Sequence, residues 1–288
     1  MRIETLEHYL NKRHTEQTTK TYVYYIDVFL MKNKNAKGLL YGDILNYINE
    51  LKTSTGDVSN LSTKLASIKR YYDYLLETGQ RNDHPCRNIR LKRKKKPVQL
   101  QDLFTSSELE LLMNRENRYK DLELRNKVTI SLLIYQALSG SELIRLQIKN
   151  INLDEGTIYI KGSKKIASRT LNLKPNQIML IQRYMDTSRQ NLMQSETDCL
   201  LITQRGVPET VDGVNSMIQP LKGLFPDRNL NPMTIRQSVI SNLLNEHRKS
   251  IEDVQLFAGH RWPSTTEQYR RKNIDEQREM INMLHPLG

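Results

Sequence analysis

The spacing of apolar residues in the first part of the chain predicts a series of helices. Over residues 15–33 the apolar side chains recur three or four positions apart, which places them on one helix face, with Thr15 or Thr18 as the candidate N-cap. A second helical stretch covers residues 41–51 and a polar loop follows at residues 53–60. A third stretch begins at Leu61 and ends at Gly79, a residue type that commonly terminates helices. We therefore expect this part to be all-α.

The second part combines helices with one short hairpin. Thr105 and Ser106 lie just before Glu108, which is typical of a helix start. Residues 157–161 alternate between apolar and polar side chains, and residues 169–173 return after a turn, which predicts two antiparallel strands. Helical spacing recurs over residues 128–135, 141–146, 176–189, 213–224, 234–247 and 251–257. The predicted fold class is mainly α with a small antiparallel sheet.

A run of basic residues separates the two parts. Five consecutive Lys or Arg side chains precede Pro97, a composition that resists packing into a core. At 288 residues the chain is long enough for two cores. The sequence therefore predicts an all-α domain over residues 1–91, a basic linker over residues 92–103 and a second domain over residues 104–288.

The net charge favours a polyanionic partner. The chain has 44 Lys and Arg against 32 Asp and Glu, a net charge of +12. No apolar run reaches about 18 residues and the N-terminus is charged, so we expect a cytoplasmic protein that binds nucleic acid and no membrane. The two cysteines have no partner at ligand spacing, so we expect neither a metal site nor a disulfide framework.

Basic residues in two places are candidate DNA contacts. One group lies between core positions of the third helix and the other is the linker run, which could lie along phosphates and add salt-sensitive affinity. The alternative is a solvated helix face and a solvated charge run. These candidates are Lys64, Lys69, Arg70, Lys92, Arg93, Lys94, Lys95 and Lys96.

The most specific motif is the stretch FAGHRWPSTTEQY at residues 257–269. It resembles the final box of the tyrosine recombinase (phage integrase) family, in which a Gly-His pair is followed nine residues later by the nucleophilic tyrosine. The resemblance implies that Tyr269 attacks a DNA phosphate and that His260 belongs to the same site. One tyrosine among 14 would otherwise be an ordinary core or surface aromatic.

The chemistry explains why these residue types occur together. A hydroxyl can break a phosphodiester without metal or other cofactor if fixed cations neutralise the charge that grows on the nonbridging oxygens. A free phenol has a pKa of about 10, so it needs nearby cations and a proton acceptor. The covalent phosphotyrosyl bond conserves the energy needed to rejoin the strand.

Two further boxes resemble the family. Residues 231–236 occupy the place of its His-x-x-Arg box, which makes Arg236 a phosphate clamp and places Met233 where the family usually has histidine. The hairpin resembles the turn that carries a catalytic lysine, so Lys161 is the implied general acid toward the leaving 5′ oxygen. Lys164 and Lys165 compete for this role, because hairpin register is easily misjudged.

The first-arginine box departs from the family pattern. Residues 136–143 read QALSGSEL, and Ser139 stands where the family has arginine. The loss of one transition-state donor typically costs roughly 3 to 4 kcal/mol, so another cation is needed at the phosphate. Arg145 is the nearest candidate, although its spacing along a helix points it away from Ser139, and Arg125 and Lys127 are looser ones. Some integrases of mobile elements lack this arginine and still recombine.

The resemblance also implies an architecture. The first domain is similar to the family's all-α, SAM-like core-binding domain, and the second to its α+β catalytic domain. Together they would form a C-shaped clamp around duplex DNA, with four protomers on two sites and accessory DNA-bending proteins as further partners, in association with the nucleoid. Residues 274–287 would dock into a neighbouring protomer or pack against their own domain.

The function implied is integration, excision or resolution of DNA at specific sites for a mobile element, through a 3′-phosphotyrosyl intermediate. Two alternatives remain open at this point. One is a catalytically degenerate DNA-binding protein of the same fold, with Ser139 and Met233 as signs of decay. The other is an enzyme similar to type IB topoisomerases, which share the chemistry.

Overall fold

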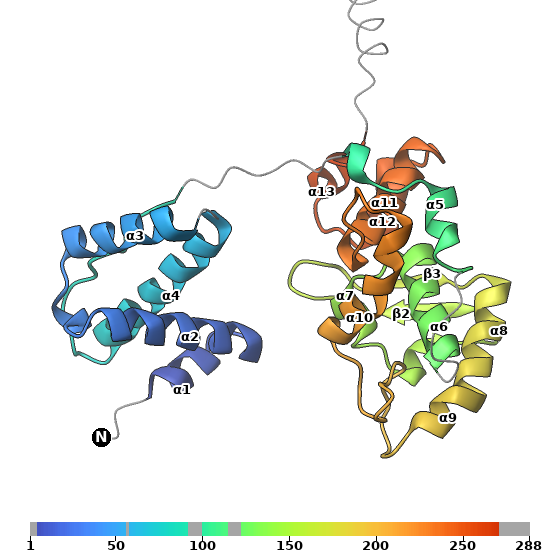
Figure 1. Ribbon diagram of the computed structural model, residues 1–288, viewed down its shortest axis with the longest axis horizontal. Helices are drawn as coiled ribbons and strands as arrows, with labels where there is room; N and C mark the ends of the chain where they lie inside the picture. Colours follow the sequence, from blue (N-terminus) through green and yellow to red (C-terminus); the bar gives the residue numbers. More distant parts are fainter. Residues whose placement is uncertain (1–4, 56–57, 92–99, 115–121, 271–288) are drawn as a thin grey trace, which may run out of the picture. The chain divides into compact units, whose positions relative to one another are not determined.

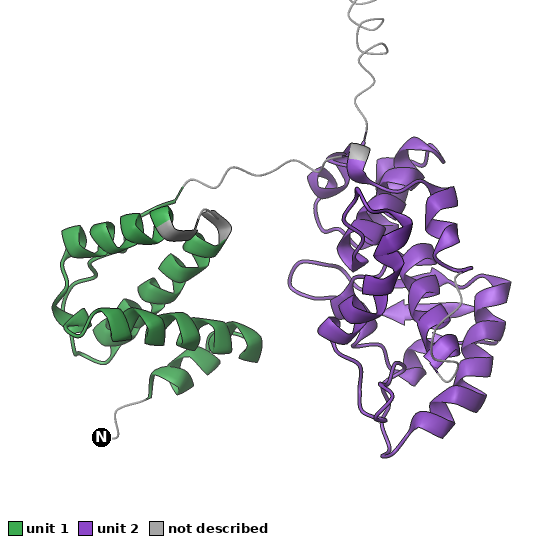
Figure 2. Ribbon diagram, in the orientation of Figure 1, with its two compact units in different colours: residues 1–96 green, residues 97–288 purple. Residues whose placement is uncertain are grey.

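The chain folds as two compact units, residues 1–96 and residues 97–288 (Figure 2). The computed structural model describes residues 5–55, 58–91, 100–114 and 122–270. The division between the units falls at the end of the basic run at residues 92–96, which lies outside the described residues, as does the expected tail at residues 274–287. Each unit is described by itself.

Unit 1 is helical, and its elements follow the apolar pattern of the sequence (Figure 1). Thr15 is the N-cap of the helix that was predicted over residues 15–33, and its hydroxyl accepts from the Thr18 backbone N–H at 3.4 Å. A loop was predicted over residues 53–60. In the structure, one helix continues to Thr55 and the next begins at Val58, so helix covers most of this range. The elements are α1 (Leu6–Asn11), α2 (Glu16–Lys32), η1 (Ala36–Gly38), α3 (Tyr41–Thr55) and α4 (Val58–Glu77).

Aromatic side chains form the core of unit 1 where α2 and α3 pack against α4. Phe29 is fully buried, and its ring centroid lies 5.2 Å from that of Tyr47 and 6.3 Å from those of Tyr71 and Tyr72. The buried Tyr72 hydroxyl donates to the backbone oxygen of Ala36 at 2.7 Å. Burying each such ring stabilises the fold by roughly 1.5 to 3 kcal/mol, so this cluster holds the helices together.

Unit 2 contains the remaining helices, arranged around one small sheet (Figure 1). Its first helix starts with the predicted capping box, in which Thr105 and Glu108 satisfy each other's backbone N–H groups. The helical elements are η2 (Leu100–Asp102), α5 (Ser106–Leu111), α6 (Glu123–Tyr135), α7 (Gly140–Leu143), η4 (Ile148–Asn150), α8 (Pro175–Arg183), η5 (Tyr184–Ser188), α9 (Arg189–Leu192), α10 (Val211–Ile218), η6 (Gln219–Leu224), α11 (Pro232–Asn245), α12 (Ile251–Ala258) and α13 (Pro263–Glu267).

The sheet has three antiparallel strands in the order β1 (Ile151–Asn152), β2 (Thr157–Ile160) and β3 (Arg169–Asn172). The predicted hairpin is confirmed, with Ile158 opposite Leu171 and Ile160 opposite Arg169. Strand β1 was not predicted, because two residues are too few to show an alternating pattern.

Helix α6 is the centre of the unit 2 core. It is buried along most of its length and packs against α8 and α11. The mainly helical fold with a small antiparallel sheet confirms the predicted class. Within the described ranges, no helix combines the length and the apolar character needed to cross a membrane.

Candidate active site

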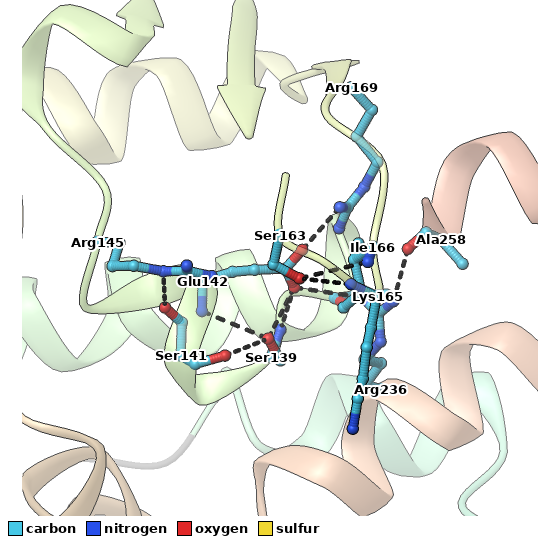
Figure 3. A network of polar contacts seen from close by, with 11 residues as sticks. Ser139, Ser141, Glu142, Arg145, Ser163, Lys165, Ile166, Arg169, Arg236 and Ala258 are labelled. Carbon is cyan, nitrogen blue, oxygen red and sulfur yellow. Dashed lines mark hydrogen bonds and ion pairs between the residues drawn. The ribbon is translucent and has the colours of Figure 1, made fainter. Parts of the chain in front are cut away.

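The carboxylate of Glu142 lies at the centre of a buried polar cluster in unit 2 (Figure 3). Ser139 is the N-cap of α7, and both its backbone N–H and its hydroxyl donate to Glu142 Oε2 at 2.8 Å. An N-cap serine typically stabilises a helix by about 1 kcal/mol. The residue at the place of the family's arginine therefore has a clear structural role here.

Two arginines from distant segments approach this carboxylate. Arg236, on α11, lies 3.4 Å from Glu142 Oε2 and also donates to the backbone oxygens of Ala137 and Ala258. Arg169, at the start of β3, donates from Nη1 to Glu142 Oε1 at 2.7 Å. The two arginines and the glutamate are all less than 9% exposed. The carboxylate thus binds one guanidinium through each of its oxygens (Figure 3).

The cluster contains more positive than negative charge. Burial raises the pKa of Glu142, but the hydrogen bond and charge of Arg169 and the charge of Arg236 outweigh it and hold the pKa below its ordinary value. The carboxylate is therefore ionised at neutral pH. Two guanidinium groups then face one carboxylate in a space shielded from water.

Arg169 is closely surrounded by the end of α12. A Cβ atom on Gly259 would lie 2.9 Å from Arg169 Nη1 and 2.9 Å from the backbone oxygen of Ala167, and Gly259 has a φ of +70°. The Ala167 N–H donates to the Gly259 oxygen at 2.8 Å, which ties the hairpin loop to this helix end. The glycine before His260 is thus required both by its backbone conformation and by the close approach of Arg169.

His260 follows directly and lies in the same cluster. Its Nδ1 is 3.0 Å from the Thr266 hydroxyl. Burial and then the charges of Arg236 and Arg169 lower the pKa of His260 to about 4. The imidazole is therefore neutral at pH 7.

Tyr269 follows α13, and its side chain is turned inward. It is 6% exposed and packs with Ile240, Leu244 and Val254. Its ring is stacked with that of His260 at a centroid distance of 6.3 Å. Burial raises the pKa of Tyr269. A hydrogen bond with Gln237 and the charge of Arg236 lower it, but by less. The phenol is thus protonated and lies near Arg236 and His260.

Two other residues from the family boxes lie outside this cluster. Lys161 follows β2, is exposed, and makes no hydrogen bond or ion pair with any residue that the structure describes. Met233 lies in the first turn of α11 and is 58% exposed. The lysines at positions 164 and 165 are exposed in the hairpin loop.

The cations considered as substitutes for the missing arginine have other partners. The Arg145 Nε donates to the Ser141 backbone oxygen at 2.8 Å, and Figure 3 shows this side chain on the other side of the α7 turn from Arg236. Arg125 is buried in an ion pair with Glu209 at 3.0 Å. Lys127 lies 2.6 Å from Glu123 on its own helix. None of these three side chains forms an ion pair with the Glu142 carboxylate.

The candidate DNA contacts of unit 1 are engaged within their own fold. Lys69 Nζ donates to the backbone oxygens of Arg87 and Ile89 at 2.9 and 2.7 Å. Arg70 pairs with Asp73 at 2.9 Å while remaining exposed, and Lys64 lies 5.9 Å from the centre of the Tyr25 ring. The candidates at positions 92 to 96 lie outside the described residues.

Arg169 is the site residue that the sequence analysis missed. It shares the inward-facing side of β3 with Leu171, and it lies opposite the buried Ile160. Arginine is almost never fully buried unless it is paired. A charged residue at an inward-facing position of a predicted strand was therefore the available signal.

Comparisons with known proteins give the family. The model of the phage integrase family matches residues 102–276. The tyrosine recombinase XerD of Halalkalibacterium halodurans is 26% identical over 257 residues, which cover 88% of this chain and 84% of the relative.

Two solved structures share the fold. The XerH site-specific recombinase bound to its difH substrate aligns with a TM-score of 0.69 at 20% identity, over 91% of this chain and 78% of that one. The Tn1549 transposon integrase in complex with transposon right end DNA aligns with a TM-score of 0.65 at 15% identity, over 98% of this chain and 99% of that one. The family match over residues 102–276 includes every residue of the cluster around Glu142, and the chain belongs to the phage integrase family of tyrosine recombinases.

Proposed function

We propose that this chain is a site-specific DNA recombinase that cuts and rejoins strands through a 3′-phosphotyrosyl intermediate. The supporting observation is that Arg236 of α11 meets Tyr269 and His260, from the separate stretch at residues 257–269, in one cluster. A phenol can act as the nucleophile, an imidazole can exchange its proton, and a guanidinium can neutralise charge on the nonbridging oxygens.

The proposed cleavage step is a transesterification at phosphorus. The phenolic oxygen of Tyr269 forms a bond to phosphorus while the bond from phosphorus to the 5′ oxygen breaks. His260 accepts the phenolic proton, and Lys161 supplies a proton to the departing 5′ oxygen. Arg236 neutralises the charge on the nonbridging oxygens. Attack by a 5′ hydroxyl of the partner strand reverses these transfers and rejoins the DNA.

The proposal assigns a role to each part of the chain. Residues 1–91 and 104–288 would bind opposite faces of the duplex, and residues 92–103 would contribute salt-sensitive contacts to phosphates. Because Tyr269 is 6% exposed, the α13 segment has to move when DNA binds. The likeness to the Tn1549 integrase supports a mobile element as the source of the DNA. The further partners are other copies of the chain, four on DNA, and accessory DNA-bending proteins.

Covalent capture tests the proposed function directly. The substrates are nicked duplexes prepared from the DNA that flanks the gene, because a nick lets the 5′ fragment leave and traps the intermediate. We expect an SDS-resistant adduct with a 3′-phosphotyrosyl bond, and Tyr269→Phe should reduce it to background because the nucleophile is lost. Tyr159→Phe, at an exposed tyrosine of β2, is the control and should leave the adduct unchanged. Binding without any adduct would contradict the proposal.

A leaving group that needs no proton tests the role of Lys161. We expect Lys161→Ala to slow cleavage by about 10²- to 10⁴-fold on an ordinary duplex, because the 5′ oxygen leaves poorly without a general acid. The rate should recover on a duplex with a 5′-thio leaving group. Lys164→Ala and Lys165→Ala are matched controls in the same loop. Equal impairment of Lys161→Ala on both duplexes would contradict the assignment.

A degenerate DNA-binding protein is the second candidate. The observation in its favour is that Ser139 forms a helix cap at the place where the family has its arginine. This candidate predicts sequence-specific binding to the flanking DNA with no adduct from the wild-type chain, so the capture experiment separates the two.

A further inference from the structure

Two nitrogens of the Arg169 guanidinium have no hydrogen-bond partner among the residues that the structure describes. Nε and Nη2 are buried and unpaired among the described residues, while Nη1 is bound to Glu142. Leaving a buried donor unsatisfied costs about 1 to 3 kcal/mol, and more when the group is charged. Native structures rarely keep such groups, and those that do use them for catalysis, complete them with water or an ion, or store strain there.

The unpaired nitrogens are arranged to bind an oxyanion. Nε–H and Nη2–H lie on one edge of the planar guanidinium and point in the same direction. This spacing matches two oxygens of one phosphate, which is the bidentate geometry that arginine offers and lysine does not.

The charge of the cluster points to the same ligand. Arg169 and Arg236 carry two positive charges, Glu142 carries one negative charge, and His260 is neutral. One positive charge therefore remains uncompensated in a buried place, which is costly. A phosphodiester carries one negative charge and would balance it.

Arg169 lies close to Ser139, the position at which the family has its arginine. Its Nη1 contacts the same carboxylate that the Ser139 backbone and hydroxyl contact, so it reaches the place next to position 139 from β3. A cavity of about 440 Å³ is lined by both Arg169 and His260. Arg169 and His260 thus line the same cavity, while Nε and Nη2 themselves are buried, so a phosphate would have to displace the atoms that cover them.

We propose that Arg169 is a catalytic residue that binds the scissile phosphate through Nε and Nη2, in place of the arginine that is absent at Ser139. Glu142 is then a positioning residue that holds Arg169 and Arg236 on either side of the phosphate. The inference rests on the proposed function, because it deepens the account of the same site.

The first experiment measures cleavage of the nicked flanking duplexes by Arg169→Ala. We expect the rate of adduct formation to fall by about 10²- to 10³-fold, as for the loss of one transition-state donor, with DNA affinity changed by less than about threefold. Arg145→Ala is the matched control, because this exposed arginine is bound only to a backbone oxygen, and its rate should stay within about twofold of wild type. An Arg169→Ala chain that cleaves at the wild-type rate would overturn the assignment.

The second experiment separates phosphate binding from a purely structural role. A methylphosphonate at the scissile position removes the charge that Arg169 would neutralise, so the ratio of the wild-type rate to the Arg169→Ala rate should fall below about tenfold. The same loss on both duplexes would mean that Arg169 only supports the fold, and the assignment would be wrong. Arg169→Lys, which keeps a charge beside Glu142 but lacks the paired nitrogens, provides the same test if the alanine variant does not fold.

The third experiment places an arginine at position 139, where the family has it, in a chain that lacks Arg169. The double variant Ser139→Arg with Arg169→Ala should cleave at least about tenfold faster than Arg169→Ala alone. A double variant that cleaves no faster than Arg169→Ala would contradict the proposal that Arg169 takes the role of an arginine at position 139. Failure of the proposed function would look different. The wild-type chain itself would then give no adduct that depends on Tyr269, and both proposals would be wrong.

Discussion

The basic residues of the two units differ in their burial and in their hydrogen-bond partners. In unit 1, Lys69 and Arg70 lie near the surface and are already bound to backbone oxygens or to an acidic side chain. In unit 2, Arg169 and Arg236 are buried around one carboxylate, yet two nitrogens of Arg169 find no partner in the described part of the chain. Lys69 and Arg70 are thus satisfied near the surface, whereas the buried Arg169 is satisfied only in part.

If Arg169 binds the phosphate as proposed, exposure is a poor guide to a phosphate-binding cation. A surface lysine gains little from a partner, because water already satisfies its ammonium group. A buried guanidinium with two unpaired nitrogens is costly, and an anion that binds them would remove this cost. Unsatisfied donors in the core are therefore more informative than positive charge on the surface.

The largest effect should follow from removing the counter-ion of the buried cluster. Glu142→Gln leaves two guanidinium groups without a carboxylate, and we expect the free energy of unfolding to fall by about 3 to 5 kcal/mol in urea titrations at pH 7. Glu252→Gln, at an exposed position of α12, should change it by less than about 0.5 kcal/mol.

The same variant predicts a pH dependence. The pKa of Glu142 is lower in the folded chain, so its contribution is complete above the ordinary value of 4.5 and is lost as the pH falls through the folded value. The difference between wild type and Glu142→Gln should therefore shrink below about pH 4.5. A constant difference down to acid pH would show that Arg169 and Arg236 do not depend on this carboxylate.

An intermediate effect is expected from His260. Its pKa falls from 6.5 to about 4 in the folded chain, so the neutral form stabilises the fold above pH 6.5 and this contribution is lost as the pH drops toward 4. At about 1.4 kcal/mol for each pH unit, the wild-type chain should lose about 3 kcal/mol over this range relative to His260→Gln. His247→Gln, an exposed histidine, is the control. Parallel stability curves for wild type and His260→Gln would contradict the arrangement of charges around this imidazole.

The smallest effects on stability are expected at Lys69 and Arg70, and these two residues should differ in their effect on DNA binding. Lys69→Met removes hydrogen bonds to two backbone oxygens, so we expect a loss of about 1 to 2 kcal/mol in the free energy of unfolding and no change in the salt dependence of DNA binding. Arg70→Ala should cost less than about 1 kcal/mol, since its ion pair is exposed. If Arg70 contacts a phosphate, its loss should lower the slope of log affinity against log salt by about 0.9. A change of slope for Lys69→Met instead would reverse this assignment.

Much of the fold follows from the sequence alone because its signals are local. The Thr15 cap, the capping box of Thr105 and Glu108, and the hairpin at residues 157–173 depend on residues within a few positions of each other. The family boxes that contain Arg236, His260 and Tyr269 are equally local patterns. The sequence also contained a further capping box, Ser139 with Glu142, that was not recognised as a helix start.

Only the tertiary structure decided which charged groups meet. Arg169 and Glu142 are 27 positions apart, and no local pattern links a strand residue to a carboxylate in the first turn of another element. The same holds for Lys69, which is bound by carbonyls 18 and 20 positions away, and for the inward rotation of Tyr269. Periodicity fixes the face on which a side chain lies, but its partner depends on how distant segments pack. The sequence therefore determined the elements and the boxes, and packing determined which cation is left for the phosphate.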